Sequence, residues 1–278
     1  MSDFIMLDGA RDAPIPLAQE VHLWFASVSE TVDVSFVDRY LELMSPYERE
    51  RYVRLVSPQD RNRYAVTRAL VRNVLSRYAD VAPERWIFVE GPYGRPELAP
   101  NEGQRAFGLQ FNISHVRDQV VVAVVLCRRV GVDIESMARR ISFNVAKRHF
   151  SPAEVDDLLS MPIEYQQKRF LELWTLKESY VKARGMGFYL PLSKFSFTFK
   201  SAGILGFGCD HSIETSPERW VFVLMEVNEN YLVAICVERI FAMQMDIVCR
   251  RVTPLGDVQR MHGQVTYHYP GFFGVGLA

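Results

Sequence analysis

The sequence predicts an α+β protein made of two similar lobes, each with a long helix packed on a mainly antiparallel sheet. The prediction depends on a repeat. The helix start Ser-Pro-x-Glu occurs at Ser45 and again at Ser151, and each start opens a long helical stretch. Each stretch then leads to an aromatic strand, residues 86–88 in the first case and 195–197 in the second. A repeated helix-and-strand unit indicates internal duplication.

The repeat divides the chain into three parts. We expect an N-terminal lobe, a C-terminal lobe and a C-terminal extension whose role the sequence leaves open, over residues 1–127, 128–240 and 241–278. An internally duplicated chain can form a site between its own halves. It can therefore work as a monomer.

The composition is that of an ordinary globular protein. The chain has 278 residues, of which 49% are hydrophobic and 23% charged, with a net charge of -1. No apolar run approaches the roughly 18 residues of a membrane span, and the N-terminus lacks the basic start of a signal peptide. We expect a cytoplasmic protein with no membrane partner. The cysteines show no Cys-x-x-Cys spacing, and Cys127 and Cys236 lie in apolar stretches where a buried thiol is expected.

The first lobe is predicted to begin with a strand over residues 21–25 and to continue with a basic helical stretch from Ser45 to Arg77 that restarts near Ser57. The stretch carries eight arginines and three acids, a local surplus of five positive charges. Such a stretch is usually a solvated face or, less often, a nucleic-acid footprint. Because the surplus is modest and no nucleic-acid motif accompanies it, we expect no nucleic-acid partner.

The second lobe concentrates acidic residues. Asp133 and Glu135 follow the apolar run 120–126, and strand alternation puts them on one face. Helical spacing places Trp174, Glu178 and Lys182 in one row. By themselves, Glu178 and Lys182 would be a solvated pair that contributes about 0.2 to 0.5 kcal/mol. Together with the two strand acids, Glu178 can complete an oxygen-ligand site for Mg²⁺.

Three motifs, in order, carry a family resemblance. They are Phe111–His115 (FNISH), Gly131–Glu135 (GVDIE) and Trp174–Lys182 (WTLKESYVK). The chain resembles the 4'-phosphopantetheinyl transferases, in particular the large pseudo-dimeric type of the surfactin synthetase-activating enzymes. The likeness runs from about Ser45 to about Glu238. It implies an active site at the junction of the lobes.

The resemblance also implies a reaction. The 4'-phosphopantetheine arm of coenzyme A would pass to a serine of an apo acyl or peptidyl carrier protein, with release of adenosine 3',5'-bisphosphate. Asp133, Glu135 and Glu178 would hold Mg²⁺, and Glu178 would also accept the proton of the serine. Lys182 would lie against the α-phosphate, and Trp174 is expected to anchor the helix by packing.

Further residues would contact the phosphates of coenzyme A. The resemblance assigns Ser114 and His115 to the 3'-phosphate, and Arg51 and Arg63 to other phosphate contacts. Arg95 stands where the family has the lysine of a Gly-Lys-Pro turn, so a planar fork replaces a point charge. We expect the other arginines of the basic stretch to be surface charges, namely Arg49, Arg54, Arg61, Arg68, Arg72 and Arg77.

Two other functions use the same residues. A Mg²⁺-dependent pyrophosphate hydrolase would take water as nucleophile, and a non-catalytic module would bind coenzyme A or a carrier protein without turnover. Consumption of coenzyme A that requires an apo carrier separates the transferase from both. The segment from Glu135 to Phe150 flanks the predicted site and is the expected carrier-docking surface.

Overall fold

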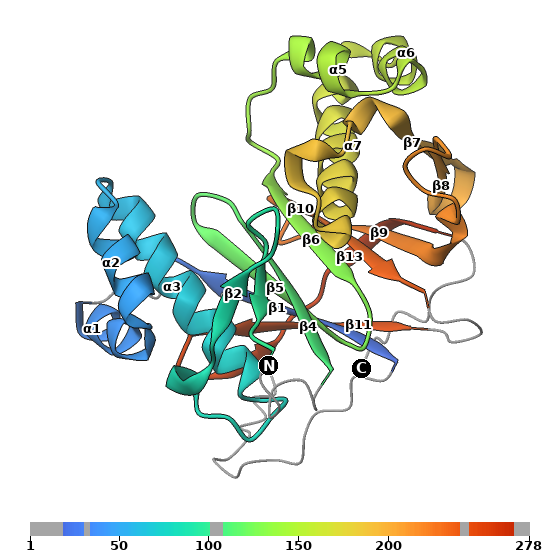
Figure 1. The fold of residues 1–278 in the computed structure, drawn as a ribbon. Coiled ribbons are helices and arrows are strands. Elements are labelled where there is room, and N and C mark those ends of the chain that lie inside the picture. Colours follow the sequence, from blue (N-terminus) through green and yellow to red (C-terminus); the bar gives the residue numbers. More distant parts are fainter. Residues whose placement is uncertain (1–18, 31–33, 101–107, 240–244, 270–278) are drawn as a thin grey trace.

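Four layers make up the protein: a helix, two sheets packed face to face, and a second helix (Figure 1). The computed structural model describes residues 19–30, 34–100, 108–239 and 245–269. The sequence expectations for the N-terminus and for the aromatic end beyond Tyr269 lie outside these residues. Long helix α3 covers the first sheet and long helix α7 covers the second. This arrangement confirms the predicted α+β class with two lobes.

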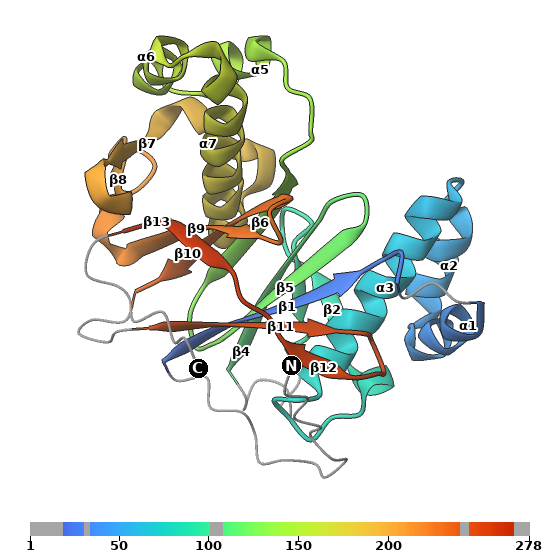
Figure 2. The ribbon, with the colours of Figure 1, turned by 180° about the vertical axis from the view of Figure 1, so that it is seen from behind.

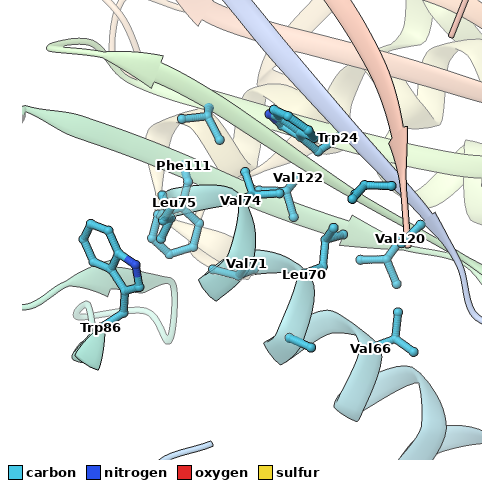
Figure 3. Packing of buried hydrophobic residues seen from close by; sticks show 14 of the residues in the cluster. Trp24, Val66, Leu70, Val71, Val74, Leu75, Trp86, Phe111, Val120 and Val122 are labelled. Carbon is cyan, nitrogen blue, oxygen red and sulfur yellow. The ribbon is translucent and has the colours of Figure 1, made fainter. Parts of the chain in front are cut away.

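The first lobe is a five-stranded sheet in the order β12-β11-β1-β5-β4, antiparallel except for the parallel pair β1 and β11. Its strands are β1 (Glu20–Ser27), β4 (Leu109–His115), β5 (Gln119–Leu126), β11 (Asp246–Val252) and β12 (Val258–Arg260). Its helices are α1 (Val34–Leu43), α2 (Pro46–Arg54) and α3 (Pro58–Leu75). In Figure 3, Leu70 and Val74 of α3 pack against Trp24 of β1 and Val122 of β5.

The second lobe is a six-stranded sheet in the order β6-β10-β9-β13-β8-β7. Its strands are β6 (Val130–Ser136), β7 (Phe195–Lys200), β8 (Ile204–Cys209), β9 (Trp220–Val227), β10 (Tyr231–Glu238) and β13 (Gln264–His268). Its helices are α5 (Phe143–His149), α6 (Pro152–Ser160) and α7 (Ile163–Arg184). A small hairpin of β2 (Phe88–Glu90) and β3 (Pro96–Leu98) belongs to the first half of the chain. The strand predicted from Trp86 therefore begins later, at Phe88, because the buried Trp86 carbonyl accepts a hydrogen bond from Arg72 instead of a ladder partner.

Both predicted helix starts are capping boxes. In the first, the Ser45 hydroxyl accepts from the Glu48 amide at 3.2 Å, and the Glu48 carboxylate accepts from the Ser45 amide at 2.9 Å. In the second, the corresponding distances between Ser151 and Glu154 are 3.3 and 2.9 Å. Each box satisfies two backbone N–H groups that the first helical turn leaves without partners.

The same two glutamates form buried ion pairs with the long helices. Glu48 lies 2.5 Å from Arg72 of α3, and Glu154 lies 2.7 Å from Lys177 of α7. Arg72 is 1% exposed, so the prediction that it is a surface charge is wrong. Its charge can be buried because Glu48 pairs with it and the Trp86 carbonyl accepts from it at 2.7 Å.

The chain beyond residue 244 contributes strands to both lobes, which answers a question that the sequence leaves open. Figure 2 shows β11 beside β1, with β12 on the other side of β11, and β13 beside β9. No helix within the described ranges is long and apolar enough to cross a membrane. Cys236 is buried as predicted, but Cys127 is exposed because it lies in the turn after β5 with a φ of 54°.

Candidate active site

Edge strands β4 and β6 meet where the two lobes join. Side chains of β4, and not its backbone, accept hydrogen bonds from the backbone amides of β6 there. The Asn112 Oδ1 accepts from the Val132 amide at 2.8 Å, and the Ser114 Oγ accepts from the Ile134 amide at 3.3 Å. The motif residues of β4 thus bind the strand that carries the two predicted acids.

A glycine lets helix α7 approach β6 closely. A Cβ at Gly131 would lie 2.0 Å from the Ser179 carbonyl oxygen and 2.3 Å from the Ala183 amide nitrogen, well inside contact distance. The helix backbone therefore packs directly on the strand at this point. This contact brings the row of Glu178 and Lys182 beside the residues that follow Gly131.

The alternation of β6 gives each side chain its face. Val132 and Ile134 belong to the core between the two sheets, so Asp133 and Glu135 face α7. Both acids are at most 9% exposed. The charge of Asp133 acts on Glu178 and on Glu135, so the three predicted acids lie within electrostatic reach of one another.

Lys182, Ser114 and Asp133 form a hydrogen-bonded triangle at the junction. The Lys182 Nζ donates to the Asp133 Oδ1 and to the Ser114 Oγ, both at 2.7 Å. The Ser114 hydroxyl donates to the same Asp133 oxygen at 2.9 Å. The other carboxylate oxygen of Asp133, Oδ2, is buried without a hydrogen-bond partner. One residue from the first lobe and two from the second therefore share a single polar centre.

The other two acids hold their protons more tightly than exposed carboxylates do. Burial, and then the charge of Asp133, raises the pKa of Glu135 to about 7, although its carboxylate also pairs with Arg139. The same two causes raise the pKa of Glu178. Burial therefore favours the neutral form of both carboxyl groups first, and the nearby charge of Asp133 adds to this effect.

These residues suit a divalent cation, although they are not gathered into a finished ligand set. Across the described ranges, no group of three His, Cys, Asp or Glu side chains is arranged to hold a metal ion. Lys182 and Arg139 instead each bind one of the acids. The unpartnered Oδ2 of Asp133 and the raised pKa values nonetheless fit Mg²⁺, which needs only one or two protein carboxylates and completes its shell with substrate oxygens.

Positive groups gather next to this acidic centre. His115 follows Ser114 on β4 and is exposed, and partial burial together with the charges of Arg63 and Lys182 lowers its pKa. Arg63 donates to Asp60 at 2.5 Å and remains partly exposed. Three of the predicted phosphate contacts thus lie near one another. Arg51 is 54% exposed and has Glu90 as its ion-pair partner at 3.4 Å.

Comparison with known proteins agrees with this geometry. A family model described as the 4'-phosphopantetheinyl transferase superfamily matches residues 129–236, and one described as 4'-phosphopantetheinyl transferase, N-terminal, matches residues 33–126. The chain is 31% identical over 199 residues to the 4'-phosphopantetheinyl transferase Sfp of Bacillus subtilis, covering 72% of this chain and 84% of that protein. The chain belongs to the 4'-phosphopantetheinyl transferase superfamily.

A second relative has the same activity in its name. The 4'-phosphopantetheinyl transferase HetI of Nostoc is 34% identical, over 62% of this chain and 71% of that protein. Among solved structures, the holo-[acyl-carrier-protein] synthase of Thermotoga maritima is 19% identical, with a TM-score of 0.33 over 40% of this chain and 62% of that one. The predicted family and the predicted reaction, transfer of phosphopantetheine from coenzyme A to a carrier protein, are thereby confirmed.

Arg95 of the transferase binds backbone carbonyls at the lobe junction, including that of Lys182. Its Nη1 donates to the Lys182 carbonyl at 2.5 Å and to the Ala183 carbonyl at 3.4 Å. Its Nη2 donates to the carbonyls of Phe111 and Val130, both at 3.0 Å. The guanidinium therefore binds backbone oxygens of three elements.

Sequence reasoning missed two residues that support the site. Lys177, inside the third motif, is fully buried and binds Glu154 and the carbonyls of Leu192 and Phe195, which fixes α7 against the start of β7. The position of Lys177 next to Glu178 in the third motif is the one feature of the sequence that points to it. Arg139 forms an ion pair with Glu135, four residues before it. The sequence does not predict this pair, because Arg139 lies beyond the end of β6 and no helical pattern places the two residues on one face. Trp174 is half-buried and stacks on Phe170, with ring centroids 6.0 Å apart, as a packing anchor would.

Proposed function

We propose that the transferase holds Mg²⁺ with Asp133, Glu135 and Glu178 and performs its reaction at the junction of the lobes. The observation that carries the proposal is the buried, unpartnered Oδ2 of Asp133, which lies at the meeting point of Ser114 and Lys182. A bound Mg²⁺ would polarise the pyrophosphate of coenzyme A and neutralise charge that develops on its oxygens.

In this proposal, Glu178 is the general base. The carrier serine oxygen bonds to the phosphorus next to pantetheine, the bond from that phosphorus to the bridging oxygen breaks, and adenosine 3',5'-bisphosphate leaves. Glu178 accepts the serine proton. Its raised pKa supports this role, because a base whose pKa is closer to neutral binds the transferred proton more firmly.

Lys182 and the groups around it would bind the phosphates. The Lys182 Nζ would bind the α-phosphate and stabilise the leaving bisphosphate, and Asp133 would hold Mg²⁺. Arg63 and His115 lie near enough for their charges to interact, which supports a common anion site for the 3'-phosphate with Ser114 beside it. Arg51, half-exposed on α2, would reach outward to the remaining phosphate oxygens.

The carrier would dock beside the junction, on the segment that follows Glu135 and runs through Phe150. Lys147 and Arg148 of this segment are exposed, which suits a partner with an acidic surface. A hollow of about 370 Å³ opens next to Met137 and is lined further by Ile163, Glu164, Gln167, Lys168 and Leu171. Apo acyl and peptidyl carriers are both proposed substrates, and a cytoplasmic location is proposed with them.

Intact-mass measurement on a panel of apo carriers tests this function. Each carrier is incubated with the transferase, coenzyme A and Mg²⁺, and a productive carrier gains the mass of one phosphopantetheine arm. A parallel assay without a carrier follows coenzyme A. Consumption without a carrier would favour the pyrophosphate hydrolase, and calorimetric binding of coenzyme A with no mass gain on any carrier would favour the non-catalytic module.

A further inference from the structure

Arg95 reaches from one lobe into the other. It lies at the end of the turn that joins β2 and β3, and this turn closes through a hydrogen bond from the Gly91 amide to the Arg95 carbonyl at 2.8 Å. Its side chain passes Gly185, where a Cβ would lie 3.6 Å from the Arg95 Cδ. The guanidinium ends among backbone atoms of α7, β4 and β6.

The terminal nitrogens of Arg95 have no donor left over. Nη1 and Nη2 carry four N–H groups between them, and the structure gives four carbonyl acceptors, at 2.5, 3.4, 3.0 and 3.0 Å. A phosphate that took one of these groups would remove a hydrogen bond from a carbonyl of the lobe junction. Binding a phosphate and holding the junction are therefore competing roles for this side chain.

The acceptors belong to the elements that carry the site. The Lys182 and Ala183 carbonyls lie in the last turn of α7, where the Gly185 amide also donates to the Lys182 carbonyl at 3.2 Å and the helix end carries partial negative charge. The carbonyls of Phe111 and Val130 lie on β4 and β6, next to the residues that link these strands. One planar cation thus joins the three elements that contribute Lys182, Ser114 and Asp133.

We propose that Arg95 is a positioning residue that fixes the end of α7 against β4 and β6 and so sets the Lys182–Ser114–Asp133 triangle. This differs from the phosphate contact that the family resemblance implies for its position. The inference rests on the proposed roles of Lys182 and Asp133. A lysine in place of Arg95 has three donors on one nitrogen instead of four N–H groups spread over two, so Arg95→Lys should keep only part of these four hydrogen bonds.

Arg95→Lys and Arg95→Ala test this role, with Arg63→Lys and Arg63→Ala as matched controls. We expect both Arg95 variants to lose at least about tenfold in kcat with the KM for coenzyme A within about threefold of wild type. Amide hydrogen exchange should become faster at the end of α7 and along β6 in both. The Arg63 variants should instead raise the KM, less for lysine than for alanine, and leave exchange at these elements unchanged.

The inference would be overturned if Arg95→Lys had the kcat and exchange rates of the wild type, or if the Arg95 variants changed only the KM. Either result would indicate a phosphate contact, because a phosphate contact tolerates lysine. Arg95→Lys decides the question if Arg95→Ala does not fold. Failure of the proposed function has another signature. Full activity in Asp133→Ala would remove the site assignment, whereas the exchange measurement reports on the junction without any turnover.

Discussion

The two lobes share one scaffold, but β6 of the second lobe presents carboxylates to its long helix where β1 of the first presents apolar side chains. In each lobe a capping-box glutamate pairs with a buried cation on that helix, Glu48 with Arg72 at 2.5 Å and Glu154 with Lys177 at 2.7 Å. In each lobe the cation also donates to backbone carbonyls near the start of the next strand. The feature that the two lobes have in common is therefore this buried ion pair, which holds the long helix in place.

The lobes differ on the strand that faces the long helix. Strand β1 presents Trp24 and Ala26 to the core around α3, where β6 presents Asp133 and Glu135 to α7. The residue after the buried cation also differs, since Asn73 follows Arg72 whereas Glu178 follows Lys177. The comparison separates the scaffold from the proposed site: the buried ion pair occurs in both lobes, whereas the acids of the proposed cation site occur on β6 and α7 of the second lobe.

The largest expected effect is the loss of turnover in Asp133→Ala. The substitution removes the unpartnered Oδ2 and the acceptor of both Lys182 and Ser114, so transfer should fall by at least about a thousandfold, or about 4 kcal/mol of barrier. The measurement is a carrier mass assay with excess Mg²⁺, with circular dichroism to establish a native fold. Substantial activity in a folded variant would place the metal site elsewhere.

Removing the capping-box glutamate of either lobe should lower the unfolding free energy by a similar amount. Glu48→Ala and Glu154→Ala each leave a buried cation unpaired, which should cost about 3 to 5 kcal/mol of unfolding free energy. The exposed pair of Glu50 and Arg54 on α2 supplies the control, since Glu50→Ala should cost less than about 1 kcal/mol. Urea unfolding measures all three. If one glutamate proved dispensable, the two lobes would not share their scaffold in energetic terms.

Glu178→Gln should lower turnover without changing the stability of the second lobe. The amide keeps the shape of the side chain but cannot accept the serine proton, so kcat should fall by more than about tenfold, corresponding to about 1.4 kcal/mol. Thermal unfolding should change little, because Glu178 has no ion pair among the described residues that the fold would lose. Wild-type turnover would exclude Glu178 as the base.

Glu135 predicts a pH dependence that is confined to the second lobe. Its pKa is raised to about 7, so it stabilises the fold most below its ordinary value near 4.5 and loses this contribution as the pH rises through about 7. Mg²⁺ binding requires the deprotonated carboxylate, so the cation should raise the melting temperature more at about pH 8 than at about pH 6. Thermal melts of wild type and Glu135→Gln check this, and an equal Mg²⁺ effect at both pH values would contradict it.

The sequence predicts what local periodicity determines. Both capping boxes, the shared face of Asp133 and Glu135, and the row of Glu178 and Lys182 follow from spacings within one element. The bonds of Arg95 do not, because its acceptors include Lys182, 87 positions along the chain. The burial of Arg72 depends on Glu48 in the preceding helix, and alternation within β11 gives no sign that it will pair with β1.

The smallest expected effect comes from the counterpart of Glu178 in the first lobe. Asn73→Asp adds a carboxylate to α3, but β1 supplies Trp24 and Ala26 there, so no second cation site should form. We expect transfer within about twofold of wild type, a difference of about 0.4 kcal/mol. A second Mg²⁺ bound by this variant would mean that the strand acids are not what distinguishes the lobes.

Calorimetric titration with Mg²⁺ tests the central claim, that the acids of the second lobe form one cation site at the junction. Wild type with coenzyme A bound should take up one Mg²⁺ per chain, and Asp133→Ala should take up none, whereas Asn73→Asp should behave as wild type. Equal Mg²⁺ binding by wild type and Asp133→Ala would contradict the account.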